Sequence, residues 1–542
     1  MQKPALHVIR RVPGSRFGVI CLIILFACLW VVLLSAQAQP IQTAGAEVVL
    51  TVATPIPVVT YGAGGDQRDV DIYPALAYAS ASQRFLLVWL SLRNAGTQNA
   101  GFDLYGQFLD QAGQPSGGQF RISDSNTVAR SNLPTVTSDG MNFVVAWTEL
   151  NSACRLKTQP VTDSSNQPDR LLDFGLTGHQ HSPQLLYNGA LGQYVLAFVV
   201  GDDYLPPVLA GASLTDVASC GSNASSTSEV RAAAFHFAQG LPTLDKQTVV
   251  SQGQGGAFRP ALALAPSGSE YLLAWEDRRS SAGLPYRFDV YSQRLSADLT
   301  LLNNNLALAT DVSYENGDNS ATWTPRPSVV SGAGGFLVTW FEHTSAVSSE
   351  TWQVIGQLIN DPQTAAKFEL MRMSFGQSHP NDAPTGFLTS SFDALNQEFA
   401  LAVSGHFESF IGYLPLLRLQ RFTANGQLLR LDGSMRPSAG VGDRLDLSNA
   451  GQLAVAMTNY TTGARSGYLI GYAKNVVDNH ARDYDIWRSY LEFQAQTPTP
   501  TATGTLQPSP TATNTATVTH SPTPTATSSA LLYQQHLPLV VR

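Results

Sequence analysis

Short runs in which apolar and polar residues alternate dominate the chain between residues 55 and 496. Residues 102–110, 288–296 and 352–360 are clear examples, rich in aromatic and β-branched side chains. A period of two residues predicts strands rather than helices. Long stretches with the 3.6-residue period of an amphipathic helix are missing, so the sequence predicts an all-β protein.

A repeated unit contains these strands. Each copy opens with a proline, passes through an alternating segment and a turn, and reaches a strand that ends in tryptophan. A further strand follows, with Tyr or Gln at alternate positions. In the four clearest copies the proline and the tryptophan are 13 or 15 residues apart: Pro74 and Trp89, Pro134 and Trp147, Pro260 and Trp275, Pro327 and Trp340. Weaker copies open at Pro183, where Phe198 replaces the tryptophan, at Pro384 and at Pro437.

The spacing of the seven opening prolines, 49 to 77 residues, suits four short strands per unit. Sheets that are apolar on both faces bury those faces by packing on one another around an axis. The sequence therefore predicts a seven-bladed β-propeller of four-stranded antiparallel blades. The last unit ends near residue 493 without an outer strand, so we expect the N-terminal strand at residues 55–61 to close the ring.

The two ends of the chain have different compositions. Basic residues precede an apolar run from residue 17 to 34 and the small residues of Ser35-Ala36-Gln37-Ala38, which predicts a signal peptide over residues 1–38. The run is nearly long enough to span a bilayer, so an uncleaved membrane anchor is the alternative. Residues 39–54 are expected to be a linker, and residues 55–496 the propeller.

A segment rich in Thr and Pro follows the propeller at residues 497–529, and its composition predicts a disordered, extended stalk. A short apolar tail, residues 530–542, ends the chain. The tail is too short to cross a membrane. It serves either in surface sorting or retention, or only as a sticky disordered end.

The repeat has the form P-x-hydrophobic, hydrophobic-x-W-x-[DE] and D-[VLI]-Y-x-Q-x-L, and it resembles the propeller repeats of uncharacterised secreted and surface proteins of bacteria. The Leu-Pro-Leu-Val ending after a Thr/Pro stalk is similar to endings found on exported proteins of some filamentous bacteria. The resemblance implies a propeller fold and a secreted or cell-surface setting, and it transfers no catalytic residue. The chain lacks the paired glycines of kelch repeats, the S-x-D-x-G-x-x-W boxes of sialidases and the G-H…W-D pattern of WD40 units.

The charge and the cysteine content of the chain limit the partners it can bind and the compartment in which it can work. Loss of residues 1–38 leaves 28 Lys and Arg against 40 Asp and Glu, a formal net charge of −12. Such a chain is a poor partner for nucleic acid, whose affinity depends on basic side chains that neutralise phosphates. Cys154 and Cys220 are the two cysteines outside the leader, and they predict one disulfide in an oxidising compartment. We expect a monomer that contacts a membrane only if the leader is uncleaved.

The sequence contains no established catalytic or cofactor motif. It lacks G-x-S-x-G, H-E-x-x-H, a phosphate loop and an EF-hand pattern, so no cofactor and no catalytic residue is predicted. His179 and His181 are close neighbours without an evident third metal ligand. Residues 316–319, Asn-Gly-Asp-Asn, fit either a structural calcium loop or a simple turn.

One acidic position recurs two residues after the tryptophan, as Glu149, Asp277 and Glu342. These three residues, called the rim carboxylates below, are expected to face one rim of the propeller. There they would bind a ligand, serve in glycoside hydrolysis as paired carboxylates, or make only a repeated structural contact. Three functions follow: a non-catalytic module that binds an extracellular carbohydrate or protein, a polysaccharide-active hydrolase or lyase, and a structural envelope component. Convergence of a rim carboxylate with an opposing carboxylate would favour the enzyme, and carboxylates satisfied within their own blades would favour binding or structure.

Overall fold

The computed structural model describes residues 49–59, 70–92, 102–124, 133–164, 168–202, 220, 228–253, 255–280, 288–310, 312, 324–332, 335–346, 349–360, 366–375, 387–409, 412–445, 452–463, 465–475 and 484–494. The expected leader, stalk and tail lie outside these ranges, as do residues 316–319. Across the described ranges every regular element is a strand, and no helix there has the length and apolar character needed to span a membrane.

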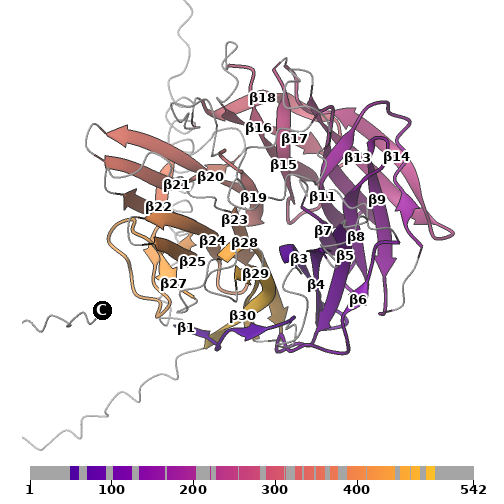
Figure 1. The fold of residues 1–542 in the computed structure, drawn as a ribbon. Helices are drawn as coiled ribbons and strands as arrows, with labels where there is room; N and C mark the ends of the chain where they lie inside the picture. The colour runs from indigo at the N-terminus through magenta and orange to yellow at the C-terminus, as the bar shows by residue number, and fades with distance from the viewer. Residues whose placement is uncertain are drawn as a thin grey trace, which may run out of the picture. The chain divides into compact units, whose positions relative to one another are not determined.

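Seven antiparallel sheets form the blades of a β-propeller, as the sequence predicts (Figure 1). We number the blades in chain order. Blade 1 consists of β3 (Val70–Ala79), β4 (Arg84–Leu92), β5 (Phe102–Leu109) and β6 (Phe120–Arg121); blade 2 of β7 (Thr135–Ser138), β8 (Phe143–Leu150), β9 (Cys154–Val161) and β10 (Arg170–Leu171); and blade 3 of β11 (Gln180–Asn188), β12 (Gln193–Val200), β13 (Glu229–Ala238) and β14 (Leu241–Val249). Blade 4 consists of β15 (Ala257–Leu264), β16 (Glu270–Asp277), β17 (Asp289–Ser296) and β18 (Leu301–Ala309); blade 5 of β19 (Ser328–Gly332), β20 (Gly335–Ala346), β21 (Ser349–Ile359) and β22 (Phe368–Phe375); blade 6 of β23 (Phe387–Asp393), β24 (Glu398–Ser409), β25 (Gly412–Thr423), β26 (Leu428–Leu429) and β27 (Asp443–Arg444); and blade 7 of β28 (Gln452–Thr462), β29 (Arg465–Asn475) and β30 (Tyr484–Gln494).

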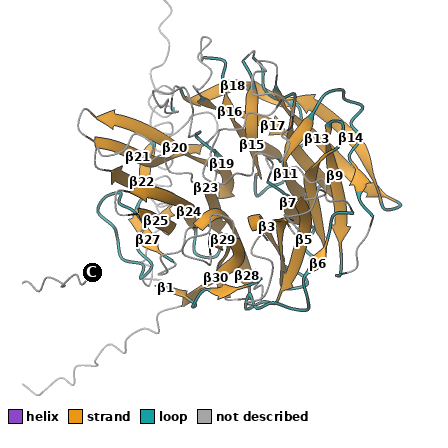
Figure 2. Ribbon diagram, viewed as in Figure 1, coloured by secondary structure: helices purple, strands orange, loops and turns teal. Residues whose placement is uncertain are grey.

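The first strand of each blade lies nearest the axis (Figure 2). Each of these inner strands contacts the inner strand of the next blade, and β28 of blade 7 contacts β3 of blade 1, so the circle is complete. A closed ring leaves no blade with an uncovered face, which explains why both faces of the sheets are apolar.

The N-terminal segment closes the ring, as the sequence predicts. Strands β1 (Val49–Val52) and β2 (Ile56–Pro57) both pair antiparallel with β30 and supply the outer edge of blade 7 (Figure 1). The closing strand begins at Val49, within the stretch that the sequence assigned to a linker. Pairing satisfies the backbone groups along an edge that would otherwise be open.

The repeated tryptophans fill the core. Trp89, Trp147, Trp275 and Trp340 lie on the second strand of their blades and have no solvent-exposed surface. Phe198, which replaces tryptophan in blade 3, is equally buried. Large rings at a constant position fill the space between adjacent sheets, which accounts for the spacing of proline and tryptophan.

A β-bulge marks the opening proline in several blades. The pairing of the inner strand shifts around Pro74, Pro183 and Pro260. The residue before the proline has a positive φ in four blades: Tyr73 at 56°, Ser182 at 55°, Arg259 at 45° and Arg326 at 45°. Such a conformation is costly for non-glycine residues, and it persists here because the ring geometry imposes it at an equivalent place in these four blades.

The assignment of Pro437 as the opening residue of the seventh unit is wrong. Pro437 precedes β27, which pairs with β25 and belongs to blade 6. Blade 7 starts with β28, whose own register shift lies between Gln452 and Val455. That bulge forms around Leu453 and Ala454 without a proline, so the sequence signal was absent and a nearby Arg-Pro pair was mistaken for it. Pro384 lies outside the described residues.

The repeated glutamine of the third strand clamps that strand to the fourth. In blade 4 the Gln293 side-chain amide donates hydrogen bonds to the carbonyls of Arg294, Leu302 and Asn303 at 2.9, 2.9 and 3.2 Å. Gln107 in blade 1 makes the same set of contacts with Phe108, Ser116 and Gly117. The clamp adds side-chain hydrogen bonds between the third strand and the outer edge, where the backbone pairing is short or irregular.

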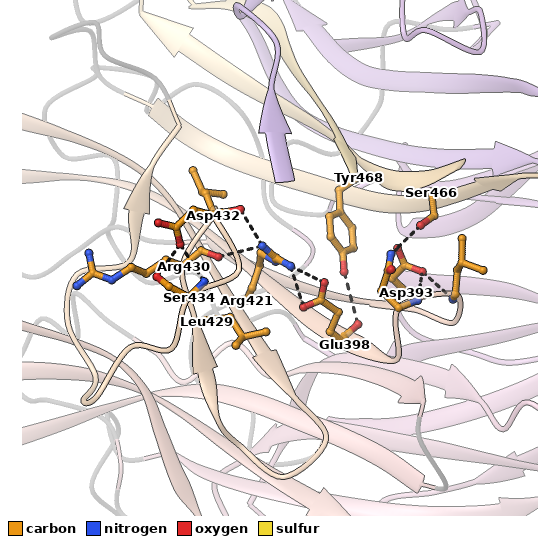
Figure 3. Close-up of polar contacts among 12 residues, drawn as sticks. Asp393, Glu398, Arg421, Leu429, Arg430, Asp432, Ser434, Ser466 and Tyr468 are labelled. Atoms are coloured by element: carbon orange, nitrogen blue, oxygen red, sulfur yellow. Dashed lines mark hydrogen bonds and ion pairs between the residues drawn. The ribbon is translucent and has the colours of Figure 1, made fainter. Parts of the chain in front are cut away.

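A buried ion pair ties the closing strand to blade 6 (Figure 3). Arg421 donates to both carboxylate oxygens of Glu398 at 2.7 and 3.1 Å, and their side chains are 2% and 6% exposed. Arg421 also donates to the carbonyl of Leu431 at 2.8 Å, which accepts a second hydrogen bond from the Leu50 amide at 2.7 Å. One guanidinium thereby connects the outer hairpin of blade 6 to β1.

Candidate functional site

Each rim carboxylate is engaged by its own blade. Asp277 accepts a 2.7 Å hydrogen bond from the indole of Trp275 and two from the guanidinium of Arg279, at 2.8 and 2.7 Å. The Asp277 side chain is 4% exposed. A carboxylate held by three charged or polar donors is a structural group that fixes the tryptophan and the following turn.

The other two rim carboxylates have comparable partners. Glu342 accepts hydrogen bonds from Trp340 at 2.9 Å and from the ammonium of Lys367 at 3.0 Å. Glu149 forms an ion pair with Lys157 at 2.9 Å. In blade 1, where Ser91 occupies the equivalent position, Trp89 donates instead to Asp71 of the neighbouring strand at 3.0 Å. An acid that accepts from the indole is therefore present in blades 1, 4 and 5, although its origin changes, whereas the Trp147 indole of blade 2 makes no hydrogen bond to a described residue.

A shallow groove lies beside Glu342 at the outer edge of blades 4 and 5. Thr310 and Lys367 line it with Glu342 and residues 307–309, and its volume is about 380 Å³. The groove is open and its surface is mostly polar, unlike the enclosed, largely apolar sites that hold small ligands.

The two cysteines form the disulfide Cys154–Cys220, with their Cα atoms 5.6 Å apart. His179 lies against it and accepts a 3.0 Å hydrogen bond from the Cys154 amide. His181 is buried, and its ring contacts the Ser182 hydroxyl and the Gly201 carbonyl. Within the described residues no group of three or more His, Cys, Asp or Glu side chains is arranged to hold a metal ion.

Five other residues meet where the inner strands begin, and we call them the axial cluster: Tyr73, Arg259, Glu276, Arg326 and Phe387. They come from blades 1, 4, 5 and 6. Tyr73, Arg259 and Arg326 are residues of the bulged position with positive φ, and Phe387 is the first residue of β23. Since the inner strands of a propeller run in the same direction, their beginnings surround one mouth of the central channel.

Contacts across the axis place this cluster in the mouth. The rings of Tyr73 in blade 1 and Phe387 in blade 6 have centroids 5.6 Å apart, although blade 7 separates those blades around the ring. The Arg326 guanidinium of blade 5 lies over the Phe387 ring at 4.0 Å and interacts electrostatically with Tyr73. Side chains of blades 1 and 5 reach one another only over the central opening.

Glu276 supplies the negative charge of the cluster and is fully occupied. Its Oε2 accepts a 2.7 Å hydrogen bond from Arg259, and its Oε1 accepts one of 2.9 Å from the backbone amide of Arg326. The side chain has no exposed surface. Arg259 also donates to the Thr324 hydroxyl at 3.0 Å. Glu276 therefore orients both arginine positions and neutralises Arg259.

Arg326 has a different environment. Protein atoms surround it, yet part of its surface is accessible to solvent, as expected of a group that lines a channel. Among the described residues no carboxylate lies within 4.0 Å of its guanidinium. Burial, and then the neighbouring charge of Arg259, lower the pKa of Arg326 to about 10, so it remains charged at neutral pH. The axial cluster thus presents one cation to the mouth.

The sequence drew attention to Asp277 and missed its neighbour Glu276. Successive side chains of a strand point to opposite faces, so Asp277 joins Trp275 while Glu276 turns toward blade 5. A signal did exist. The two clear units that open with Arg-Pro, at Arg259 and Arg326, are consecutive, and consecutive blades place equivalent residues side by side at the axis.

Comparisons with known proteins find similar folds at low identity. No family model and no curated protein matches the chain. The haemagglutinin-neuraminidase of parainfluenza virus 5 is 12% identical over 70% of this chain and 95% of that one, with a TM-score of 0.41. A protein of unknown function from Dyadobacter fermentans is 13% identical over 82% and 99%, with a TM-score of 0.38. The α-L-arabinanase of Penicillium chrysogenum is 11% identical over 82% and 98%, with a TM-score of 0.38. The proposals below therefore depend on this chain's own residues.

Proposed function

We propose that this chain is an exported, non-catalytic binding module whose ligand enters the axial mouth. The observation that carries the proposal is the arrangement of Arg326, a partly exposed cation on the axis flanked by Tyr73 and Phe387. Convergent polar and aromatic groups are typical of ligand sites. The partner would be an extracellular carbohydrate or protein, met by a monomer that is secreted or held at the cell surface.

The carboxylates weigh against glycoside hydrolysis. That reaction uses two carboxylates about 5 to 10 Å apart, one of which donates or accepts a proton while the other attacks or activates water. Glu276 is the one carboxylate of the axial cluster, and both its oxygens accept hydrogen bonds from the protein. The rim carboxylates belong to separate blades, where each is held by neighbouring donors.

A binding screen tests the proposal. Residues 39–542 would be applied to arrays of glycans and extracellular proteins, and each bound glycan would then be incubated with the protein and analysed for cleavage. We expect binding without turnover. Turnover would reject the non-catalytic function, and the absence of any bound ligand would favour the structural envelope component.

Two variants locate the site. Tyr73→Leu alters the axial mouth, and Lys367→Ala alters the groove beside Glu342. We expect Tyr73→Leu to weaken binding and Lys367→Ala to leave it unchanged. The reverse pattern would move the ligand to the outer edge of blades 4 and 5.

A further inference from the structure

We infer that the ligand of the axial mouth carries a carboxylate, held by the edge of the Arg326 guanidinium, and that it is an acidic saccharide. This inference rests on the proposed function and adds the chemical class of the ligand. Three features of the cluster support it: the free edge of Arg326, the charge left in the mouth, and the aromatic wall beside it.

The first feature is the orientation of Arg326. Its guanidinium lies over the Phe387 ring at 4.0 Å, so one planar face is covered. The N–H groups point outward in the plane of the guanidinium rather than from its faces, and stacking does not use them. No hydrogen bond from this guanidinium to a described residue is present, although its backbone amide is held by Glu276. As far as the described residues show, the in-plane edge is therefore available to an acceptor from outside.

Other arginines of the same blades show the contrast. Arg279 donates to both oxygens of Asp277, and Arg294 donates to both oxygens of Glu270 at 2.9 and 2.7 Å. Arg279 uses Nε and a terminal nitrogen, so its guanidinium meets the carboxylate edge to edge, the geometry in which arginine binds carboxylates most strongly, whereas Arg294 reaches Glu270 through one terminal nitrogen. Arg326 has no carboxylate of a described residue in reach, so a ligand carboxylate would form with it the pairing that Arg279 makes with Asp277.

The second feature is charge. Arg259 and Arg326 contribute two positive charges to the cluster, and Glu276 contributes one negative charge that Arg259 takes up directly. One positive charge remains in a partly dehydrated position. Repulsion from Arg259 and burial both disfavour the charged form of Arg326, as its lowered pKa shows. An anion in the mouth would offset both effects, because it would pair with a guanidinium that has no carboxylate of a described residue within 4.0 Å.

The third feature is the wall beside the cation. Tyr73 and Phe387 lie with their rings tilted by 55° and are both partly exposed. Aromatic rings at a wet surface pack against the apolar faces of flat or ring-shaped ligands while polar tips remain solvated. A uronic acid residue combines a carboxylate with a six-membered ring that has C–H faces. Among carboxylate ligands it matches both the cation and the aromatic wall.

Calorimetric titration of residues 39–542 with an oligogalacturonate tests the inference. The matched control ligand is the same oligomer with its carboxyl groups reduced to alcohols, and a short peptide with a free C-terminal carboxylate is the third probe. The wild-type protein should bind the oligogalacturonate roughly tenfold or more tightly than either. This comparison uses the wild-type protein, so it does not depend on how a variant folds.

Two variants complete the experiment. Arg326→Gln keeps a polar side chain but removes the charge, and should weaken oligogalacturonate binding by about tenfold or more. Arg372→Gln removes a 51%-exposed arginine paired with Glu369 on the outer strand of blade 5, and should leave binding unchanged. Equal binding of the reduced oligomer, or unchanged binding by Arg326→Gln, would overturn the carboxylate, and a preference for the peptide would overturn the saccharide. Neutral glycans bound at the mouth would leave the proposed function intact, whereas no bound glycan or protein of any kind would remove it.

Discussion

Arg259 and Glu276 form an ion pair of 2.7 Å within blade 4, and the glutamate end of this pair is wholly buried. Glu276 also accepts the backbone amide of Arg326, which begins blade 5. A single carboxylate therefore joins two consecutive blades at the axis: it pairs with the Arg259 guanidinium and accepts the Arg326 backbone amide.

Replacement of that carboxylate should destabilise the propeller. Glu276→Gln keeps an acceptor for the Arg326 amide but removes the carboxylate that pairs with the Arg259 guanidinium. Loss of one member of a buried pair costs about 3 to 5 kcal/mol, and solvent access to Arg259 favours the lower end. Glu229→Gln is the control, because Glu229 pairs with Arg231 near the surface and should lose about 1 kcal/mol or less. Urea unfolding measures both, and equal losses would contradict the role given to Glu276.

The Arg421–Glu398 pair should contribute far more than an exposed pair of the same type. Arg421→Met leaves Glu398 buried without its partner, and burial already raises the pKa of Glu398. We expect a loss of about 3 to 5 kcal/mol in the free energy of unfolding. Arg465→Met, in the ion pair with Glu492, should cost about 1 kcal/mol or less because Arg465 is 56% exposed. A larger loss for Arg465→Met would exclude the buried pair as a main tie between blade 6 and β1.

Closure by β1 predicts an alternating effect of substitutions along that strand. Leu50 is 3% exposed and packs with Leu417 and Leu491, so Leu50→Ala should cost about 2 to 5 kcal/mol. Thr51 points to solvent, and Thr51→Ala should change stability by about 0.5 kcal/mol. Thermal unfolding followed by circular dichroism distinguishes them. Similar small changes at both positions would mean that β1 adds little to closure.

Asp169 predicts a pH dependence of stability. Desolvation raises its pKa from 3.8 to about 6. The folded state therefore binds this proton more tightly than the unfolded state, and stability falls as the pH rises from 3.8 to about 6, with the full cost present above that range. Asp169→Asn removes the cost, so its melting temperature should exceed that of the wild type at pH 7 and approach it below pH 4.

A second aspartate provides the opposite control. Hydrogen bonds from Ser296, then Thr300, lower the pKa of Asp298. The stability that Asp298 contributes is present above its ordinary pKa and is lost in acid, so Asp298→Asn should lower the melting temperature at pH 7. If both variants shift the melting temperature in the same direction at pH 7, the assigned environment of Asp169 is wrong.

The repeat made the fold predictable because its proline and its tryptophan have the same structural role in every unit that contains them. Pro74 and its equivalents follow a bulge at the axis, and Trp89 and its equivalents fill the interblade core. Where the proline is missing, prediction failed. Blade 7 forms its bulge with Leu453 and Ala454 and has no opening proline there. The proline pattern therefore assigned the start of this blade to Pro437, which belongs to blade 6.

The axial cluster could not be predicted in the same way. Equivalence between blades showed that an acid recurs two residues after the tryptophan. In blades 4 and 5 this acid accepts a structural hydrogen bond from the indole, as Asp277 does from Trp275. A ligand site instead depends on residues that break the repeat. Glu276 is such a residue, since Leu90 and Phe341 occupy its position in blades 1 and 5. Its pairing with Arg259 and Arg326 requires the three-dimensional order of the blades.

A crystal structure of residues 39–542 with a bound oligogalacturonate tests the central claim most directly. The account predicts a carboxylate of the ligand against the in-plane edge of Arg326, with a sugar ring beside Tyr73 and Phe387. A ligand seated instead at Glu149, Asp277 or Glu342, with the axial mouth empty, would contradict it.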